Sequence, residues 1–155
     1  MRQNKFSGTV INEMKLVLPS LSVNEGTARS VIAAFCSQLN PTATEIADIK
    51  CAVSEAVTNC IVHAYRGGIG RIYIGVRLYE ERIVRVSVKD LGCGIVDIKK
   101  ARQPLYTTDS ENERSGMGFT VMENFMDKLT VSSRPGKGTT IVMYKCINPP
   151  SLSDL

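Results

Sequence analysis

Apolar and polar positions repeat along this chain with two different periods. Alternation with a period of two predicts strands, and spacing of three to four residues predicts helices. The sequence predicts strands at 14–19, 72–78, 84–88, 129–133 and 139–145, and helices at about 23–39, 43–65 and 118–128. Because helices alternate with hairpins, we predict an α+β fold: a two-layer sandwich of a mixed, mostly antiparallel sheet with helices on one face.

Two local patterns refine this picture. Ser22 with Glu25, and Thr42 with Glu45, have the spacing of a capping box, so each pair predicts the start of a helix. The stretch 92–116 is polar and weakly periodic, apart from a short helical piece around 97–102. A stretch this long without firm structure inside a small domain is usually functional.

Length and composition limit the class of protein. The chain has 155 residues, 43% hydrophobic and 22% charged, which predicts one globular domain over 12–146 with a flexible tail at 1–11 and a disordered tail at 147–155. The net charge of +4 is spread along the chain, which permits an anionic partner and does not favour direct DNA binding. No apolar run approaches the ~18 residues of a membrane span, and the first residues lack a signal-peptide core, so we expect a cytoplasmic protein.

The five cysteines do not form a recognisable metal or disulfide pattern. Their number is odd, no two form a C-x-x-C, and the chain has a single histidine. A structural zinc site is therefore not expected, and we predict reduced thiols.

Glu55 and Asn59 are the first pair that could carry chemistry. They lie four residues apart on the second predicted helix, away from its apolar stripe, and so share one face. An amide oxygen can hold magnesium, and a carboxylate can accept a proton from an attacking hydroxyl. Taken alone, such a pair is more often a solvated helix surface.

Asp90 opens a second motif, D-x-G-x-G. It continues the buried phase of the strand 84–88, where an unpaired carboxylate is costly and needs donors. A purine amino group and a water would be suitable donors. Gly92 and Gly94 would remove side chains where a flat ligand approaches the backbone. An ordinary turn after a strand is the alternative.

Two glycine-rich segments follow. Gly116, Met117 and Gly118 open the third predicted helix, where free backbone N–H groups can bind an anion, and Arg114 adds a positive charge. A flexible loop before a helix is the alternative. The turn 136–140 could place Thr140 beside Asp90, although alone it is typical of a hairpin.

The order of these motifs resembles the Bergerat-type ATP-binding fold shared by DNA gyrase, Hsp90 chaperones, histidine kinases and MutL. The stretches that carry a closer resemblance are 54–59, 101–105, 114–120 and 122–126. They are similar to the anti-sigma-factor serine kinases of spore-forming bacteria, and above all to the anti-sigma-F factors of sporulation. The resemblance extends over about residues 12–145.

The resemblance implies ATP and magnesium as ligands. Glu55 would be the general base, Arg114 would stabilise the transferring phosphoryl group, and Asn59 would hold magnesium. His63 would make a supporting hydrogen bond. The residues implied along the nucleotide are Asn59, Asp90, Gly92, Gly94, Gly116, Met117, Gly118 and Thr140.

The resemblance also implies partners. A homodimer would bind and inhibit a sporulation sigma factor, and it would phosphorylate a serine of an anti-anti-sigma antagonist. Arg29 would contact a partner. Two alternatives stay open: an anti-sigma kinase for a general stress sigma factor, and a nucleotide-gated sigma-binding module without kinase activity.

Overall fold

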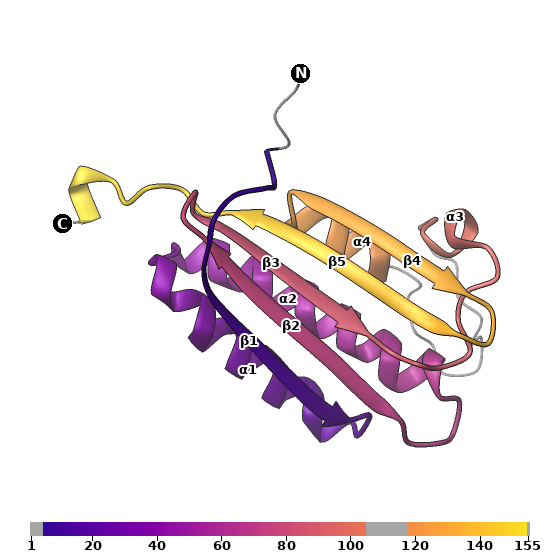
Figure 1. Ribbon diagram of the computed structural model, residues 1–155. Coiled ribbons are helices and arrows are strands. Elements are labelled where there is room, and N and C mark those ends of the chain that lie inside the picture. The colour runs from indigo at the N-terminus through magenta and orange to yellow at the C-terminus, as the bar shows by residue number, and fades with distance from the viewer. Residues whose placement is uncertain (1–4, 105–117, 155) are drawn as a thin grey trace.

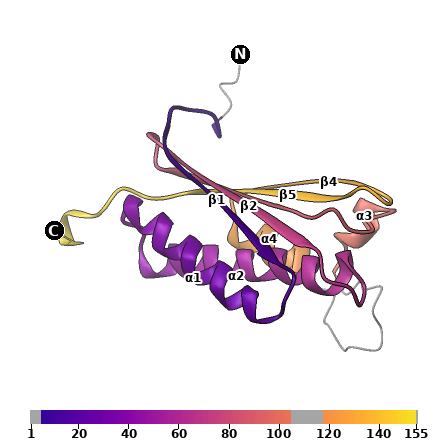
Figure 2. The ribbon, with the colours of Figure 1, turned by 60° about the horizontal axis from the view of Figure 1, so that its bottom comes forward.

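The computed structural model describes residues 5–104 and 118–154. Five strands form one sheet in the order β1-β2-β3-β5-β4, and the helices cover one face of it (Figures 1 and 2). The strands are β1 (Val10–Pro19), β2 (Arg71–Tyr79), β3 (Ile83–Lys89), β4 (Lys128–Arg134) and β5 (Gly138–Cys146). The helices are α1 (Val23–Cys36), α2 (Ala43–Asn59), α3 (Ile98–Ala101) and α4 (Gly118–Phe125), with short helical turns at η1 (Ser37–Leu39), η2 (Cys60–Ala64) and η3 (Leu152–Asp154).

The predicted α+β class is confirmed. All four pairings between the described strands are antiparallel, so the described sheet contains no parallel pair. Among the described residues, no helix combines the length and the apolar character needed to span a membrane.

The core lies between the sheet and α2. Alternate residues of the central strands point toward the helices, as the period-two pattern predicts. α2 lies against them through Ile49, Val53 and Val57, all with no exposed surface. The strand residues that belong to the same buried core are Ile72, Ile74, Val76, Leu78, Val84, Val86 and Val88.

The two predicted capping boxes have different outcomes. Thr42 and Glu45 form a complete box at the start of α2, with both reciprocal hydrogen bonds present. Ser22 correctly marks the start of α1, as its N-cap residue, but it forms no capping box, because Ser22 has helical dihedral angles and its side chain makes no cap bond. Glu25 instead pairs with Arg29 one turn later, at 3.1 Å.

Several element ends also differ from the prediction. β1 begins at Val10, inside the stretch expected to be a flexible tail, because it pairs along β2 as far as Tyr79. The long helix does not continue as a regular α-helix to Tyr65, since its last turn, η2, is π-helical. Ile147, placed in the C-terminal tail by the sequence, is 3% exposed and belongs to the core.

Candidate functional site

The site lies at the end of the molecule where α2 finishes, α4 begins and β3 runs out. Glu55 and Asn59 are half-buried on the last turns of α2. Gly118, the first residue of α4, faces both: a Cβ built on it would lie 3.1 Å from Glu55 Oε2 and 3.5 Å from Asn59 Oδ1. The structure therefore brings these three predicted site residues together, and a side chain at position 118 would lie tightly against the Glu55 carboxylate.

Asp90 lies just beyond the end of β3 and is 5% exposed. Its Oδ1 accepts hydrogen bonds from the backbone N–H of Gly92 at 2.9 Å and of Thr139 at 3.3 Å. Within residues 5–104 and 118–154, its Oδ2 accepts only the weak thiol donor of Cys60, at 3.6 Å. The predicted burial of Asp90 is confirmed, and Oδ2 retains acceptor capacity that a stronger donor could use.

Burial raises the pKa of the Asp90 carboxyl above its ordinary value. The hydrogen bonds from Gly92, Cys60 and Thr139 act in the opposite direction and do not cancel the effect of burial. A ligand that donates a hydrogen bond to this group would favour its charged form.

The π-helical turn η2 links Asp90 to the end of α2. Cys60, directly after Asn59, is its first residue, and burial raises the pKa of its thiol so that the thiol stays protonated as a donor. At the other end of the turn, the carbonyl of Ala64 accepts the N–H of Cys93 at 2.8 Å. The carbonyl of His63 accepts the Cys93 thiol at 3.2 Å. One helix thus supports both the Glu55–Asn59 pair and the Asp90 segment.

The glycines of this region are required by close contacts with protein backbone. A Cβ on Gly92 would lie 2.2 Å from the carbonyl oxygen of Ala64, and one on Gly94 would lie 2.1 Å from that of Arg134. Gly94 also has a φ of +74°. The sequence suggested room for a flat ligand at these positions, whereas the structure shows the space next to them occupied by η2 and by the β4–β5 hairpin.

Thr139, and not Thr140, lies beside Asp90. Successive residues of a strand point to opposite faces, and Ile141 and Met143 of β5 are buried toward the helices. Thr139 shares their face, is 8% exposed and bonds to Asp90. Thr140 pairs with Lys89 and Ser132 on the outer face, so the position predicted for it is wrong by one residue.

Sequence reasoning missed three members of this network, Thr139, Ser133 and Cys60. The Thr139 hydroxyl lies 2.8 Å from Ser133 Oγ, which also accepts the N–H of Ile95 at 2.8 Å. For Cys60 the sequence predicts only a reduced thiol, like the other four cysteines. The alternation of β5 could have identified Thr139, but no pattern in the sequence pairs Cys60 with Asp90.

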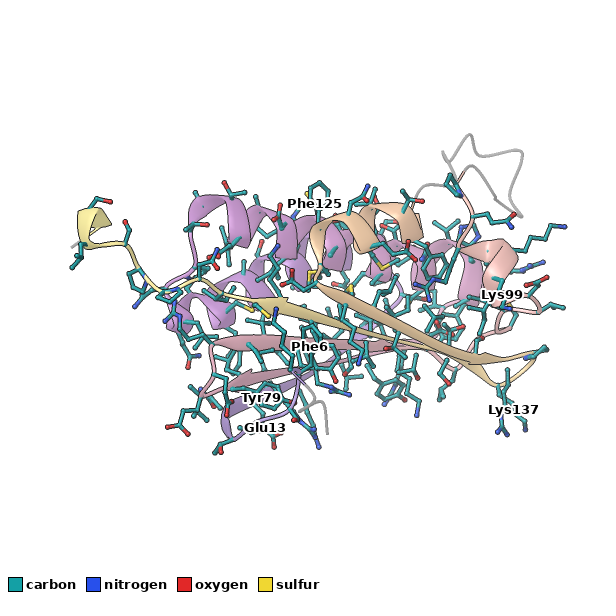
Figure 3. The ribbon with its side chains drawn as sticks, turned by 90° about the horizontal axis from the view of Figure 1, so that it is seen from above. Phe6, Glu13, Tyr79, Lys99, Phe125 and Lys137 are labelled. Atoms are coloured by element: carbon teal, nitrogen blue, oxygen red, sulfur yellow. The ribbon has the colours of Figure 1, made fainter. Side chains whose placement is uncertain are left out.

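The remaining predicted residues lie at the margin or outside the described chain. Arg114, Gly116 and Met117 are outside the described residues. Arg29, on α1, pairs with Glu25 and its Nη1 lies 3.5 Å from Ser54 Oγ on α2, with 41% of its side chain exposed. Lys99 of α3 and Lys137 of the β4–β5 turn, both labelled in Figure 3, lie at the same end of the molecule.

The donor set suits magnesium and an adenine nucleotide. Among the described residues, no group of three or more His, Cys, Asp or Glu is arranged to hold a metal. Magnesium bound together with phosphates needs only one or two protein oxygens, which the Asn59 amide beside the glycine at 118 could supply. A buried carboxylate with unused acceptor capacity suits an exocyclic amino group.

Comparison with known proteins identifies the family of this chain. Residues 18–145 match the family described as "Histidine kinase-like ATPase domain". The chain is 57% identical over 136 residues to an "Anti-sigma F factor" of Caldanaerobacter subterraneus subsp. tengcongensis, covering 88% of this chain and 94% of the relative. It is 52% identical over 135 residues to an "Anti-sigma F factor" of Bacillus subtilis (strain 168), covering 86% and 92%.

Solved structures share the fold at lower identity. The RsbU and RsbW domains of Rv1364c from Mycobacterium tuberculosis align with a TM-score of 0.67 and 21% identity, over 90% of this chain and 34% of that one. The histidine kinase domain of the Erythrobacter litoralis EL346 blue-light activated histidine kinase aligns with a TM-score of 0.52 and 18% identity, over 79% and 61%. At these identities the likeness concerns the fold alone.

Proposed function

The chain belongs to the histidine kinase-like ATPase domain family and, within it, to the anti-sigma F factors, and from this premise we propose an ATP-dependent serine protein kinase that inhibits a sporulation sigma factor. Its phosphoryl acceptor is a serine of an anti-anti-sigma antagonist. The protein acts in the cytoplasm as a homodimer, with ATP and magnesium as its ligands.

One observation carries the proposal. The last turns of α2 hold a carboxylate and an amide next to the glycine that opens α4, and the turn that follows supports a buried aspartate. This arrangement places two kinds of chemistry side by side, one on α2 and one on the segment after β3 that η2 contacts. Glu55 and Asn59 suit phosphate, metal and proton transfer, and Asp90 suits recognition of a base.

The proposed mechanism gives each residue one task. Asp90, held by the N–H groups of Gly92 and Thr139, accepts a hydrogen bond from the adenine amino group. Asn59 would hold magnesium, which supplies charge neutralisation on the phosphates when bound. Glu55 accepts the proton of the attacking serine hydroxyl. The serine oxygen bonds to the γ-phosphorus as the bond to the bridging oxygen of ADP breaks, and Arg114 stabilises the charge on the transferred group.

Transfer of labelled phosphate tests the kinase. The protein is incubated with γ-labelled ATP, magnesium and the antagonist from the same host. The wild type should label a serine of the antagonist, and Glu55→Gln should retain ATP binding and lose at least ~100-fold in transfer rate, as expected for removal of a general base. Glu13→Gln, on the edge strand β1, is the matched control and should transfer normally. Undiminished transfer by Glu55→Gln would exclude Glu55 as the base.

The partner assignments are tested by co-purification. The bound sigma factor is identified by mass spectrometry with and without magnesium-ATP. A general stress sigma factor in place of a sporulation one would support the first alternative of the sequence analysis. Nucleotide-dependent sigma binding without any transfer by the wild type would support the second, a binding module without kinase activity.

Arg29 is proposed as a partner contact on α1. Arg29→Glu should weaken sigma binding by at least ~10-fold, because it reverses a charge on a partly exposed side chain. ATP affinity should stay unchanged. Equal sigma binding by Arg29→Glu and the wild type would remove Arg29 from the interface.

A further inference from the structure

We propose that Tyr65 is a positioning residue of the nucleotide site, whose hydroxyl fixes the main chain at Leu91 and thereby the carboxylate of Asp90. The inference rests on the proposed function, because it assigns to Tyr65 a part in adenine recognition. Tyr65 follows η2 directly and lies outside every motif considered in the sequence.

The phenol of Tyr65 uses both of its hydrogen-bonding capacities. Its oxygen accepts the backbone N–H of Leu91 at 2.8 Å. Its hydroxyl donates to the carbonyl of Arg71, at the start of β2, at 2.6 Å. The hydroxyl therefore ties the segment after β3 to the neighbouring strand, and no other side-chain bond to the Leu91 N–H is present among the described residues.

The ring itself is held in place by the turn before β2. A Cβ built on Gly70 would lie 2.2 Å from the ring carbons Cε1 and Cζ, so the ring lies directly against the Gly70 backbone. Gly70 is in turn fixed to Ser20: its N–H donates to Ser20 Oγ at 2.9 Å, and its carbonyl accepts the N–H of Ser20 at 2.8 Å. A ring supported in this way can hold Leu91 in one position.

The hydrogen bond from the Leu91 N–H to Tyr65 holds the main chain next to Asp90. The Leu91 side chain is 55% exposed and does not anchor the segment by packing. Leu91 connects Asp90 to Gly92, whose N–H donates to the Asp90 carboxylate. Release of the Leu91 N–H would loosen both residues that set the direction of that carboxylate.

Burial raises the pKa of the Tyr65 hydroxyl, so the group remains a protonated donor at neutral pH. The hydroxyl can therefore keep its bond to Arg71 while it accepts from Leu91. The two bonds orient each other, since the donor direction to Arg71 leaves a lone pair toward Leu91.

Tyr65→Phe tests the proposal, with Tyr144→Phe as the matched control. Tyr144 also carries a hydrogen-bonded hydroxyl, which accepts from Arg85 at 3.3 Å, but it lies on the outer face of the sheet, away from the site. Calorimetry measures binding of ADP and of purine riboside diphosphate, which lacks only the 6-amino group. Amide hydrogen exchange at Leu91 is measured in parallel.

Tyr65→Phe should bind ADP roughly three- to tenfold more weakly, the effect of one net hydrogen bond. Its preference for ADP over purine riboside diphosphate should shrink by a similar factor, and Leu91 exchange should accelerate. Tyr144→Phe should match the wild type in all three. The preference between bases distinguishes positioning from a loss of overall stability, which would not alter it.

Gly70→Ala gives a second route to the same result, because the added methyl displaces the ring while the hydroxyl is kept. It should reproduce the weaker and less selective binding. Wild-type ADP affinity and base preference in both variants would overturn the role of Tyr65 while leaving the proposed function intact. Failure of the wild type to bind ADP would overturn the nucleotide site and this inference with it.

Discussion

At the residue scale, Asp90 combines a negative charge with near-complete burial. Each unit by which burial raises the pKa of a carboxyl corresponds to about 1.4 kcal/mol against its charged form. Asn keeps the acceptor for the N–H groups of Gly92 and Thr139 and carries no charge. Asp90→Asn should therefore stabilise the nucleotide-free protein near pH 7 and weaken adenine nucleotide binding at least ~10-fold. Urea unfolding and calorimetry measure the two effects.

The stabilising effect of Asp90→Asn should depend on pH. Because the folded-state pKa of Asp90 lies above the ordinary value of 3.8, the folded chain binds more protons than the unfolded chain between the two values. In the wild type, the stability that protonation of Asp90 contributes is fully present below about pH 3.8 and is lost as the pH rises through the raised pKa. The advantage of Asp90→Asn should thus vanish toward pH 4 and grow toward pH 7.

The residues of the site were predictable to different degrees. The period-two alternation of β3 predicts that Asp90 is buried, and the same alternation in β5 predicts that Thr139, and not Thr140, faces the helices. The contact between Cys60 and Asp90 joins positions 30 residues apart through a π-helical turn. A π-helical turn contains one residue more than an α-helical turn, and a single sequence does not indicate where it occurs. Neither Cys60 nor Tyr65 could therefore be placed in the site from the sequence.

At the element scale, the start of α2 depends on a side chain and the start of α1 does not. Thr42→Ala removes one side of a complete capping box and should lower the free energy of unfolding by about 1 kcal/mol. Ser22→Ala removes a side chain that makes no cap bond and should change it by only a few tenths of a kcal/mol. Urea unfolding compares the two variants. Equal losses would mean that the box at Thr42 does not stabilise α2.

These two helix starts also show the limit of a local pattern. Both starts have the same spacing of Ser or Thr and Glu. At α1, however, Glu25 forms an ion pair with Arg29, and Ser22 has helical dihedral angles. The backbone at the N-cap differs between the two starts: it is extended at Thr42 and helical at Ser22. The spacing of two residue types does not contain this backbone geometry.

α4 is held at its far end by a half-buried ion pair. Lys145 of β5 pairs with Asp48 of α2 at 3.0 Å and donates to the carbonyl of Phe125, the last residue of α4, at 2.7 Å. Only 12% and 19% of the Lys145 and Asp48 side chains are exposed, so solvent screens this pair less than a surface pair.

Lys145→Met should destabilise the protein by about 2 kcal/mol, because it leaves Asp48 unpaired and takes a charged donor from a helix end. Arg77→Met breaks the exposed pair with Glu13, where 47% and 54% of the side chains are exposed, and should change stability by about 0.5 kcal/mol or less. Thermal unfolding compares them. A loss no greater than that of Arg77→Met would show that Lys145 does not anchor α4.

At the scale of the whole molecule, the two ends of β3 have different tasks. One end leads into Asp90 and the site, and the other lies in the hairpin that contains Arg82. The Arg82 guanidinium donates to the carbonyls of Leu39, Ile147 and Asn148. The N–H of Asn148 in turn donates to Glu45 at 2.9 Å, the glutamate of the capping box. This end joins the α1–α2 connection, the hairpin and the last strand without any residue of the site.

Such a separation predicts that stability at the Arg82 end can be changed independently of binding. Arg82→Ala should lower the free energy of unfolding by about 2 kcal/mol, since three carbonyls lose a charged donor. The ADP affinity of the folded fraction should stay within about twofold, a difference of ~0.4 kcal/mol. Arg82 has a φ of +60°, so Arg82→Gly should recover about 1 kcal/mol of the loss by relieving the backbone while the donor stays absent. If either variant weakened ADP binding as strongly as Tyr65→Phe, the two ends of the sheet would be coupled, and the division of tasks along β3 would be wrong.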